Sequence, residues 1–207
     1  MNAETIVIVG AGQAGGWAAQ TLRGEGFKGS IILVGSEPHR PYERPPLSKA
    51  VLSGDAHADT TSLVKPDAFD LLNIDWRPNV SATAIDRSAK QLLLMHGAPV
   101  HYDKLILCSG GRARRLNIPG ADLPGVHTLR SIEDAAALGA ALRPGRRLLV
   151  VGGGWIGLEV AATARKKGMD VTVVEAMGRL CERTVPPGPT TRLCERRADV
   201  STLFTRP

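Results

Sequence analysis

The sequence IVIVGAGQAG runs from Ile6 to Gly15, where a β-branched run leads straight into three spaced glycines. A second stretch of the same kind, LLVVGGGWIG, runs from Leu148 to Gly157, 142 positions later. Each stretch predicts a buried strand, a tight turn and a helix. A single G-x-G-x-x-G motif is weak evidence for a nucleotide site, but two copies in the same strand-to-helix context reinforce each other.

The likeness between the two copies continues through the predicted helices. Placing Gly15 on Gly157 brings four further identities into register: Ala19 with Ala161, Thr21 with Thr163, Arg23 with Arg165 and Gly26 with Gly168. The sequence therefore predicts a duplicated βαβ unit. The expected fold class is α/β, with two Rossmann-like dinucleotide-binding units that are incomplete at the C-terminus.

The glycines of each copy have separate roles in binding a dinucleotide. The first makes the turn from strand to helix, the second lets the main chain approach a pyrophosphate, and the third lets the helix pack closely on the strand. The helix N-terminus then offers N–H groups and a positive dipole end to the phosphates. The predicted phosphate-binding residues are Gly10, Gly12 and Gly15 in the first copy and Gly152, Gly154 and Gly157 in the second. The alternative is that these glycines only turn the chain.

An acid follows the second strand of each copy. The runs at 31–34 and 171–174 end near Glu37 and Glu175. A carboxylate at this place accepts hydrogen bonds from the ribose hydroxyls of an adenosine, and it repels a 2′-phosphate. The second copy is therefore predicted to prefer NADH over NADPH, because no arginine follows Glu175 in the next two positions.

Composition argues against several other classes of protein. The 207 residues are 43% hydrophobic, as in globular domains, and no apolar run reaches the ~18 residues of a membrane span. The N-terminal residues lack the features of a signal peptide, so we expect a cytoplasmic protein without a membrane partner. The spacing of Cys108, Cys181 and Cys194 predicts reduced thiols and neither a disulfide framework nor a zinc site. Scattered basic residues and only 4% aromatic content predict no nucleic-acid partner, despite a net charge of +6.

The residues between and after the two copies predict shorter elements. We expect helices at 65–72 and 131–142, and strands at 76–80, 82–86, 91–95 and 102–108. The sequence SIED from Ser131 is typical of a helix cap. From Pro186 onward the sequence shows neither helical nor strand periodicity. We therefore expect a disordered tail that adds no further parallel strand to the second unit.

A proline-rich segment, RPYERPPLSK, runs from Arg40 to Lys49. Its prolines restrict the backbone, and it carries two arginines and a lysine. Such a segment can hold cationic side chains in one place over an electron-rich or anionic ring system. The alternative is an ordered surface turn.

Together these residues resemble the FAD-dependent NADH:ferredoxin reductases of bacterial aromatic-ring dioxygenase systems. These are relatives of putidaredoxin and rubredoxin reductases in the pyridine nucleotide-disulfide oxidoreductase superfamily. The matching segments are VIVGAGQAG at 7–15, RPYERPPLSK at 40–49, LILCSGGRARRL at 105–116, HTLRSIEDA at 127–135, VVGGGWIGLEVAATA at 150–164 and VTVVE at 171–175. Trp155 replaces a smaller apolar residue, Ser109 stands where threonine is commoner, and the residues after Pro187 do not match.

The resemblance implies FAD on the first glycine motif. It implies that Glu37 binds the ribose of FAD and that Arg44 and Lys49 lie on the flavin side. It also implies that Arg130 binds FAD from the loop that precedes the second unit. A cationic Lys49 near flavin N5 would favour negative charge on the reduced flavin.

On the second motif the resemblance implies NADH, with Glu175 at its ribose and Arg183 close to its adenosine. Glu159, two residues past the last glycine, would lie near the nicotinamide and the flavin. Lys49 and Glu159 are thus the candidate catalytic residues. The alternative for Glu159 is a partly exposed helix acid without this role.

The implied activity is electron transfer from NADH through FAD to a [2Fe–2S] ferredoxin, or to a rubredoxin, that serves an aromatic-ring-hydroxylating dioxygenase. A flavin disulfide reductase is excluded, because no two cysteines are close enough in sequence to form its redox pair. The implied domains are the N-terminal part of an FAD domain at 1–113, the N-terminal part of an NAD domain at 114–185, and a non-matching tail at 186–207. We therefore expect a truncated or frame-disrupted reductase with deficient activity. The alternative is a non-catalytic nucleotide-binding fragment.

Overall fold

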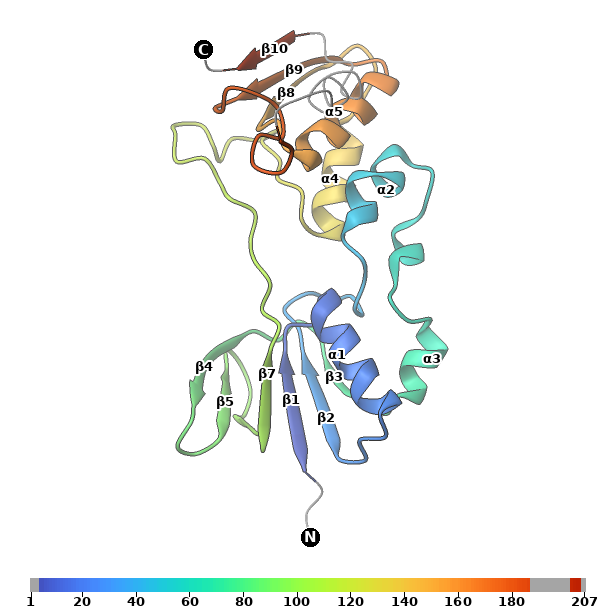
Figure 1. Cartoon of the computed structure of the whole chain (residues 1–207), viewed down its shortest axis with the longest axis vertical. Helices are drawn as coiled ribbons and strands as arrows, with labels where there is room; N and C mark the ends of the chain where they lie inside the picture. The colour runs from blue at the N-terminus through green and yellow to red at the C-terminus, as the bar shows by residue number, and fades with distance from the viewer. Residues whose placement is uncertain (1–3, 187–201, 206–207) are drawn as a thin grey trace. The chain divides into compact units, whose positions relative to one another are not determined.

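The computed structural model describes residues 4–186 and 202–205, and the chain divides into two compact units (Figure 1). Unit 1 comprises Met1–Glu43 and Asp59–Arg112, and unit 2 comprises Arg44–Ala58 and Ala113–Pro207. The chain thus leaves unit 1 after Glu43, contributes fifteen residues to unit 2, and then returns to unit 1.

Unit 1 contains a four-stranded parallel sheet in the order β3-β2-β1-β7. Its strands are β1 (Thr5–Val9), β2 (Ser30–Val34), β3 (Asp75–Arg77) and β7 (Lys104–Leu107). The helices of the unit are α1 (Gln13–Gly24), between β1 and β2, and α3 (Pro66–Leu71), before β3. An antiparallel sheet is formed by β4 (Ala82–Asp86), β5 (Gln91–Leu94) and β6 (Val100–His101).

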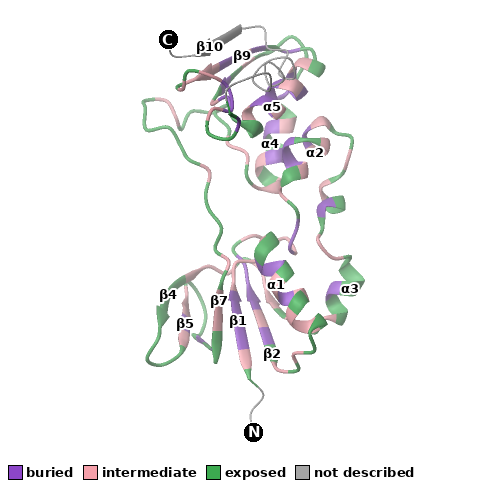
Figure 2. Ribbon diagram, viewed as in Figure 1, coloured by how far each residue is buried: buried purple, intermediate pink, exposed green. Residues whose placement is uncertain are grey.

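Alternation along β1 sends its side chains into two separate cores, as a strand period of two requires. Ile6 and Ile8 belong to a cluster with Phe69 of α3, on the face that the helices cover. Val7 belongs to a second cluster with Leu92 of β5, on the face that the antiparallel sheet covers. Figure 2 shows this burial concentrated along β1 and β2. Both faces of β1 are therefore covered, and its carboxyl end is fixed where the first glycine motif begins.

Unit 2 contains a three-stranded parallel sheet in the order β10-β9-β8 among the described residues. Its strands are β8 (Arg147–Val151), β9 (Asp170–Glu175) and β10 (Thr202–Thr205). Its longer helices are α4 (Ile132–Ala141) and α5 (Trp155–Lys166). The inserted residues form a 3₁₀ turn, η1 (Pro45–Ser48), and the helix α2 (Ala50–Ser53), before a further turn, η2 (Ala58–Thr61).

Helix α2 belongs to the hydrophobic core of unit 2. Leu52 is only 2% exposed and lies in one cluster with Leu138 of α4, Leu158 of α5 and Val171 of β9. Full burial of a leucine contributes about 1.5–3 kcal/mol. This burial explains why the inserted segment folds with unit 2.

The two βαβ copies have equivalent hydrogen bonds as well as similar sequences, and this confirms the predicted duplication. The first glycine of each copy donates its N–H to a carbonyl near the end of the following strand. The pairs are Gly10 with Val34 and Gly152 with Val174, both at 2.8 Å. At the helix ends, Arg23 and Arg165 each donate from Nη1 to a carbonyl four residues further on, at 2.8 and 3.0 Å.

Most of the other predicted elements are confirmed with small shifts of their ends. The helix at 131–142 begins with a complete capping box, in which Ser131 Oγ accepts from the Asp134 N–H and Asp134 Oδ2 accepts from the Ser131 N–H. The strand expected at 76–80 begins at Asp75 and is only three residues long. The short elements η1, α2 and β6 were not predicted.

The prediction for the tail is wrong at β10. Thr202–Thr205 pair in parallel with β9, with Thr202 opposite Thr172, so the chain does add a further strand to the second unit. The sequence TLFT at 202–205 has two adjacent apolar residues and does not alternate, so it lacks the pattern by which a half-buried strand is recognised. The disorder predicted for residues 187–201 lies outside the described residues.

Candidate dinucleotide-binding sites

The first glycine loop lies between β1 and α1. Gly10 has φ +110°, and a Cβ there would overlap the Cys108 carbonyl group. A Cβ at Gly15 would overlap the Gly10 carbonyl oxygen, so the start of α1 packs directly on the turn. Gly12 is the N-cap of α1 with an extended backbone. Gly10 and Gly15 admit only glycine, and this packing directs the N-terminus of α1 to the carboxyl end of β1.

The second loop repeats this geometry between β8 and α5. Gly152 has φ +108°, and a Cβ at Gly157 would overlap the Gly152 carbonyl oxygen. A Cβ at Gly152 or at Gly154, the N-cap of α5, would meet no described atom within 4 Å. The main chain is therefore open to a ligand at these two glycines. A pyrophosphate fits this cradle, because helix N-terminal N–H groups and the helix dipole both favour an anion.

Glu175 is fixed beside the second loop by main-chain donors. Its Oε2 accepts from the Gly153 N–H at 2.6 Å, and its Oε1 accepts from the Met177 N–H at 2.8 Å. Charge-assisted hydrogen bonds of this length are strong. The carboxylate is thus held at the end of β9, next to the glycines, as the sequence predicted.

Glu37 is placed differently in unit 1. In the strand register Val34 corresponds to Val174, so the place of Glu175 is taken by Gly35. A Cβ at Gly35 would approach Ala11 Cβ to 2.5 Å, which leaves no room for a carboxylate there. The acid of unit 1 is displaced two residues, to Glu37, where its Oε2 accepts from the Tyr42 hydroxyl.

The proline-rich segment crosses the boundary between the two units at Glu43 and Arg44. Within unit 2, Arg44 Nη1 donates to the carbonyl oxygen of Arg130, just before α4, at 2.7 Å. Leu47 is 2% exposed in the turn that follows. The structure thus joins two of the predicted FAD-binding residues, Arg44 and Arg130, through one hydrogen bond.

The two candidate catalytic residues form an ion pair inside unit 2. Lys49 Nζ lies 3.2 Å from Oε1 of Glu159 on α5. The other oxygen, Oε2, accepts from the Ser48 hydroxyl at 2.5 Å. Ser48 is 5% exposed, whereas the Lys49 side chain is 55% exposed. Consecutive residues of the proline-rich segment therefore bind both oxygens of one carboxylate.

The loop after β9 folds back onto the second glycine loop. A Cβ at Gly153 would overlap Leu180 Cδ2, and the Cys181 N–H donates to the Gly153 carbonyl oxygen at 2.9 Å. Arg183 is exposed in this loop. The sequence did not indicate these contacts of Leu180 and Cys181, because a contact between residues far apart in the chain leaves no local pattern.

Cys181 has φ +51°, which only a few non-glycine residues adopt. We expect Cys181→Val to destabilise the protein by about 1–3 kcal/mol, because a β-branched side chain is strained in this region. Thermal unfolding would measure the change. Cys108→Val, the same substitution at a partly buried cysteine of unit 1, should have a much smaller effect. Equal losses from both variants would contradict the assignment of strain to Cys181.

Cys108 and Cys181 are free thiols, as predicted, and Cys194 lies outside the described residues. Burial raises the pKa of the Cys108 thiol. A thiol with a raised pKa is a weak nucleophile at neutral pH. Cys108 contributes its carbonyl group to the wall of the first glycine loop rather than a reactive sulfur.

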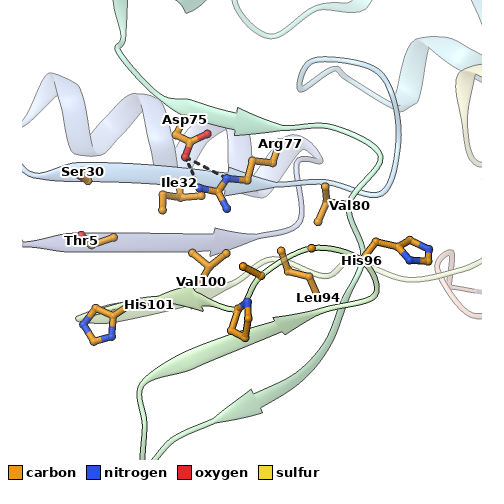
Figure 3. A pocket seen from close by; sticks show the side chains of 13 residues that line it. Thr5, Ser30, Ile32, Asp75, Arg77, Val80, Leu94, His96, Val100 and His101 are labelled. Carbon is orange, nitrogen blue, oxygen red and sulfur yellow. Dashed lines mark hydrogen bonds and ion pairs between the residues drawn. The ribbon is translucent and has the colours of Figure 1, made fainter.

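A separate cavity of about 650 Å³ lies in unit 1, at the edge between the two sheets (Figure 3). Thr5 and Ser30 line it at the amino ends of β1 and β2, whereas the glycine loop follows the carboxyl end of β1. Arg77 in its wall is paired with Asp75 at 2.6 Å. Nucleotides bind α/β sheets at the carboxyl ends of the strands. This cavity is therefore distinct from the predicted dinucleotide site.

Among the described residues, the helices are all too short or too polar to cross a membrane.

Comparisons with known proteins agree with this geometry. Residues 4–199 match the family described as pyridine nucleotide-disulphide oxidoreductase, which extends the match beyond the limit of Pro187 expected from the sequence. The chain is 49% identical over 181 residues to rhodocoxin reductase of Rhodococcus erythropolis, covering 87% of this chain and 42% of that protein. It is 43% identical over 182 residues to the ferredoxin–NAD(+) reductase component of the biphenyl dioxygenase system of Paraburkholderia xenovorans, covering 88% and 44%.

A solved structure supports the same relationship. The covalent putidaredoxin reductase–putidaredoxin complex matches with a TM-score of 0.91 and 40% identity, over 99% of this chain and 50% of that chain. The chain thus spans about half the length of the proteins it matches. The predicted resemblance, fold class and oxidoreductase character are confirmed at the level of the family, and this family implies the use of FAD and NAD(H). On its sequence and its structure, the chain belongs to the pyridine nucleotide-disulphide oxidoreductase family.

Proposed function

We propose that unit 1 binds FAD and unit 2 binds NADH, as parts of a cytoplasmic flavoprotein reductase that delivers electrons to a [2Fe–2S] ferredoxin. A rubredoxin is the alternative acceptor, and the ferredoxin would serve an aromatic-ring-hydroxylating dioxygenase. The proposal depends on one observation above all, the pair of glycine loops that share their turn geometry and their hydrogen bonds. In it, residues 1–113 contain most of the FAD domain and 114–185 contain most of the NAD domain, while residues 44–58 fold with unit 2 and Thr202–Thr205 add a strand to its sheet.

On the FAD side, the residues proposed to hold the pyrophosphate are Gly10, Gly12 and Gly15. Glu37 would accept from the ribose hydroxyls. Arg44, Lys49 and Arg130 are proposed as the cationic residues on the flavin side. The hydrogen bond from Arg44 to the Arg130 carbonyl supports a shared role for these two residues.

On the NADH side, the residues proposed to hold the pyrophosphate are Gly152, Gly154 and Gly157. Glu175 would accept from the adenosine ribose, and Arg183 would lie near the adenosine. The hydrogen bonds from Gly153 and Met177 support this role, because they hold the Glu175 carboxylate rigidly beside the loop.

Lys49 and Glu159 are proposed as the residues at the reacting rings. When bound, the two cofactors supply hydride transfer from nicotinamide C4 to flavin N5 and then release of single electrons. Lys49 would stabilise negative charge that develops on the ring next to it. Glu159 would hold the Lys49 ammonium in place through their 3.2 Å contact.

Absorbance and titration of the purified chain would test the proposal. We expect added FAD to bind with a shifted flavin spectrum, and we expect NADH to bind at a second site. Failure of either ligand to bind would overturn the proposal. Binding of both without reduction of a ferredoxin would instead support the alternative of a non-catalytic nucleotide-binding protein.

We expect the chain to bind NADH at least about tenfold more tightly than NADPH, because the fixed Glu175 carboxylate repels a 2′-phosphate. Glu175→Gln keeps the size of the side chain and removes its charge, so the preference should fall to a few-fold. Isothermal titration with both nucleotides would measure it. Asp122→Ala removes an exposed carboxylate elsewhere in unit 2 and should leave the ratio unchanged. A wild-type chain that binds NADPH as tightly as NADH would rule out this role.

A further inference from the structure

A buried phenol contacts the acid of unit 1. Tyr42 is 3% exposed, and its hydroxyl donates to Oε2 of Glu37 at 2.5 Å. A buried tyrosine hydroxyl needs a hydrogen-bond partner, and a carboxylate is the strongest acceptor that a side chain offers. The bond therefore fixes the carboxylate as well as satisfying the phenol.

The acids of the two units differ in their position relative to the preceding strand. Glu175 ends a strand and is held by two main-chain N–H groups. Glu37 lies three residues beyond the end of β2, in a bend, because Gly35 occupies the place next to the loop. A side chain that starts from a bend has more conformational freedom than one at the end of a paired strand. The hydrogen bond from the phenol thus helps to hold the Glu37 carboxylate, as two main-chain N–H groups help to hold the Glu175 carboxylate.

The backbone on both sides of Tyr42 is itself fixed. Residue 42 forms a β-bridge with Ser62, and the Leu63 N–H donates to the Pro41 carbonyl oxygen at 3.0 Å. Pro41 packs on Gly16 in the first turn of α1, where a Cβ would overlap the proline ring. The imidazole of His39 lies edge-on to the phenol ring, with 6.0 Å between the two ring centroids. These contacts therefore hold Tyr42 in place relative to α1, the helix that follows the first glycine loop.

We propose that Tyr42 is a positioning residue that orients Glu37 toward the 2′- and 3′-hydroxyls of an adenosine bound at the first glycine loop. This inference rests on the proposed function, because it takes the ligand to be the adenosine end of FAD. It assigns a role to the proline-rich segment that is independent of its cations. The tyrosine does not itself touch the ligand.

Tyr42→Phe tests this role, because it removes one oxygen and keeps the ring. The probes are FAD and its analogue with 2′-deoxyadenosine, titrated by flavin fluorescence with NAD⁺ in excess to fill unit 2. We expect the wild-type chain to bind FAD about tenfold more tightly than the analogue, since a hydrogen bond to a charged group is lost. In Tyr42→Phe the affinity for FAD should fall about fivefold and the affinity for the analogue should hardly change. The discrimination between the two ligands should therefore largely disappear.

The chain supplies a matched control, because its only other tyrosine is Tyr102. Tyr102 is 8% exposed in unit 1, and its hydroxyl donates to the Asp86 carbonyl oxygen at 3.5 Å, in the antiparallel sheet. Tyr102→Phe should preserve the discrimination between FAD and the analogue. Thermal unfolding of both variants would identify any general loss of stability.

Fluorine NMR provides a second measurement that does not depend on affinity. A chain labelled with 3-fluorotyrosine has two resonances, and the two phenylalanine variants assign them. FAD should shift the resonance of residue 42 by more than that of residue 102. The inference would be overturned if the wild-type chain discriminates between the ligands and Tyr42→Phe discriminates equally well. A wild-type chain that does not bind FAD, or that binds both ligands equally, would overturn the proposed role of the unit 1 site itself.

Discussion

Gly157→Ala is expected to weaken NADH binding by about 100-fold. This is the largest effect that we expect from a substitution that adds one methyl group. The alanine Cβ would overlap the Gly152 carbonyl oxygen, so α5 would have to move away from the turn that we propose binds the phosphates. Gly152 has φ +108° and cannot adjust without losing that turn. Titration of NADH against the purified variant would measure the loss.

Gly139→Ala is the matched control for this variant, because it makes the same change inside another helix of unit 2. A Cβ there would lie 4.0 Å from Leu52 Cδ1, which is an ordinary contact. We expect unchanged NADH binding and a gain in stability of about 0.5–1 kcal/mol, since alanine is favoured over glycine in helices. If Gly157→Ala bound NADH like the wild type, the second glycine loop would not be the dinucleotide site.

Lys49→Met is expected to lower the rate at which NADH reduces bound FAD by about tenfold. The variant keeps a long side chain and removes the charge that would stabilise the reduced flavin. It also leaves the Glu159 carboxylate with Ser48 but without its cation. Stopped-flow absorbance of the FAD-loaded protein would measure the rate, and a redox titration would measure a fall in the reduction potential.

A double substitution separates the two residues of this pair. If Glu159 acts by holding Lys49, Glu159→Gln combined with Lys49→Met should be little worse than Lys49→Met alone, because groups in contact are not additive. Lys166→Met removes an exposed lysine of α5 and should change neither the rate nor the potential. Unchanged reduction behaviour in Lys49→Met would exclude the assignment of Lys49 to the flavin.

The parts of the fold that the sequence predicted are those with a local physical cause. Gly10 and Gly152 stand where only glycine can turn the chain, and the run at Ile6 alternates between two cores. The cap at Ser131 is completed within four residues. Each of these signals depends on residues that are neighbours in the sequence, so the sequence alone indicates it.

The parts that were missed depend on contacts between distant residues. Ser48 and Glu159 are separated by 111 positions, and nothing in either neighbourhood indicates the other. The expected set of site residues included Lys49 and Glu159, but only through the resemblance to a family. The placement of Leu52 in the core of unit 2 was likewise missed, because a four-residue helix shows no periodicity.

The inclusion of Arg44–Ala58 in unit 2 determines how this protein can be divided into fragments that fold separately. A single cut after Arg112 would separate the greater part of each unit, yet the fragment from Ala113 onward would lack Leu52, Ser48 and Lys49. Separate expression of unit 2 therefore requires that residues 44–58 be supplied as a fused segment or as a peptide in trans. The two units are thus interleaved in the sequence, because the segment 44–58 of unit 2 interrupts unit 1.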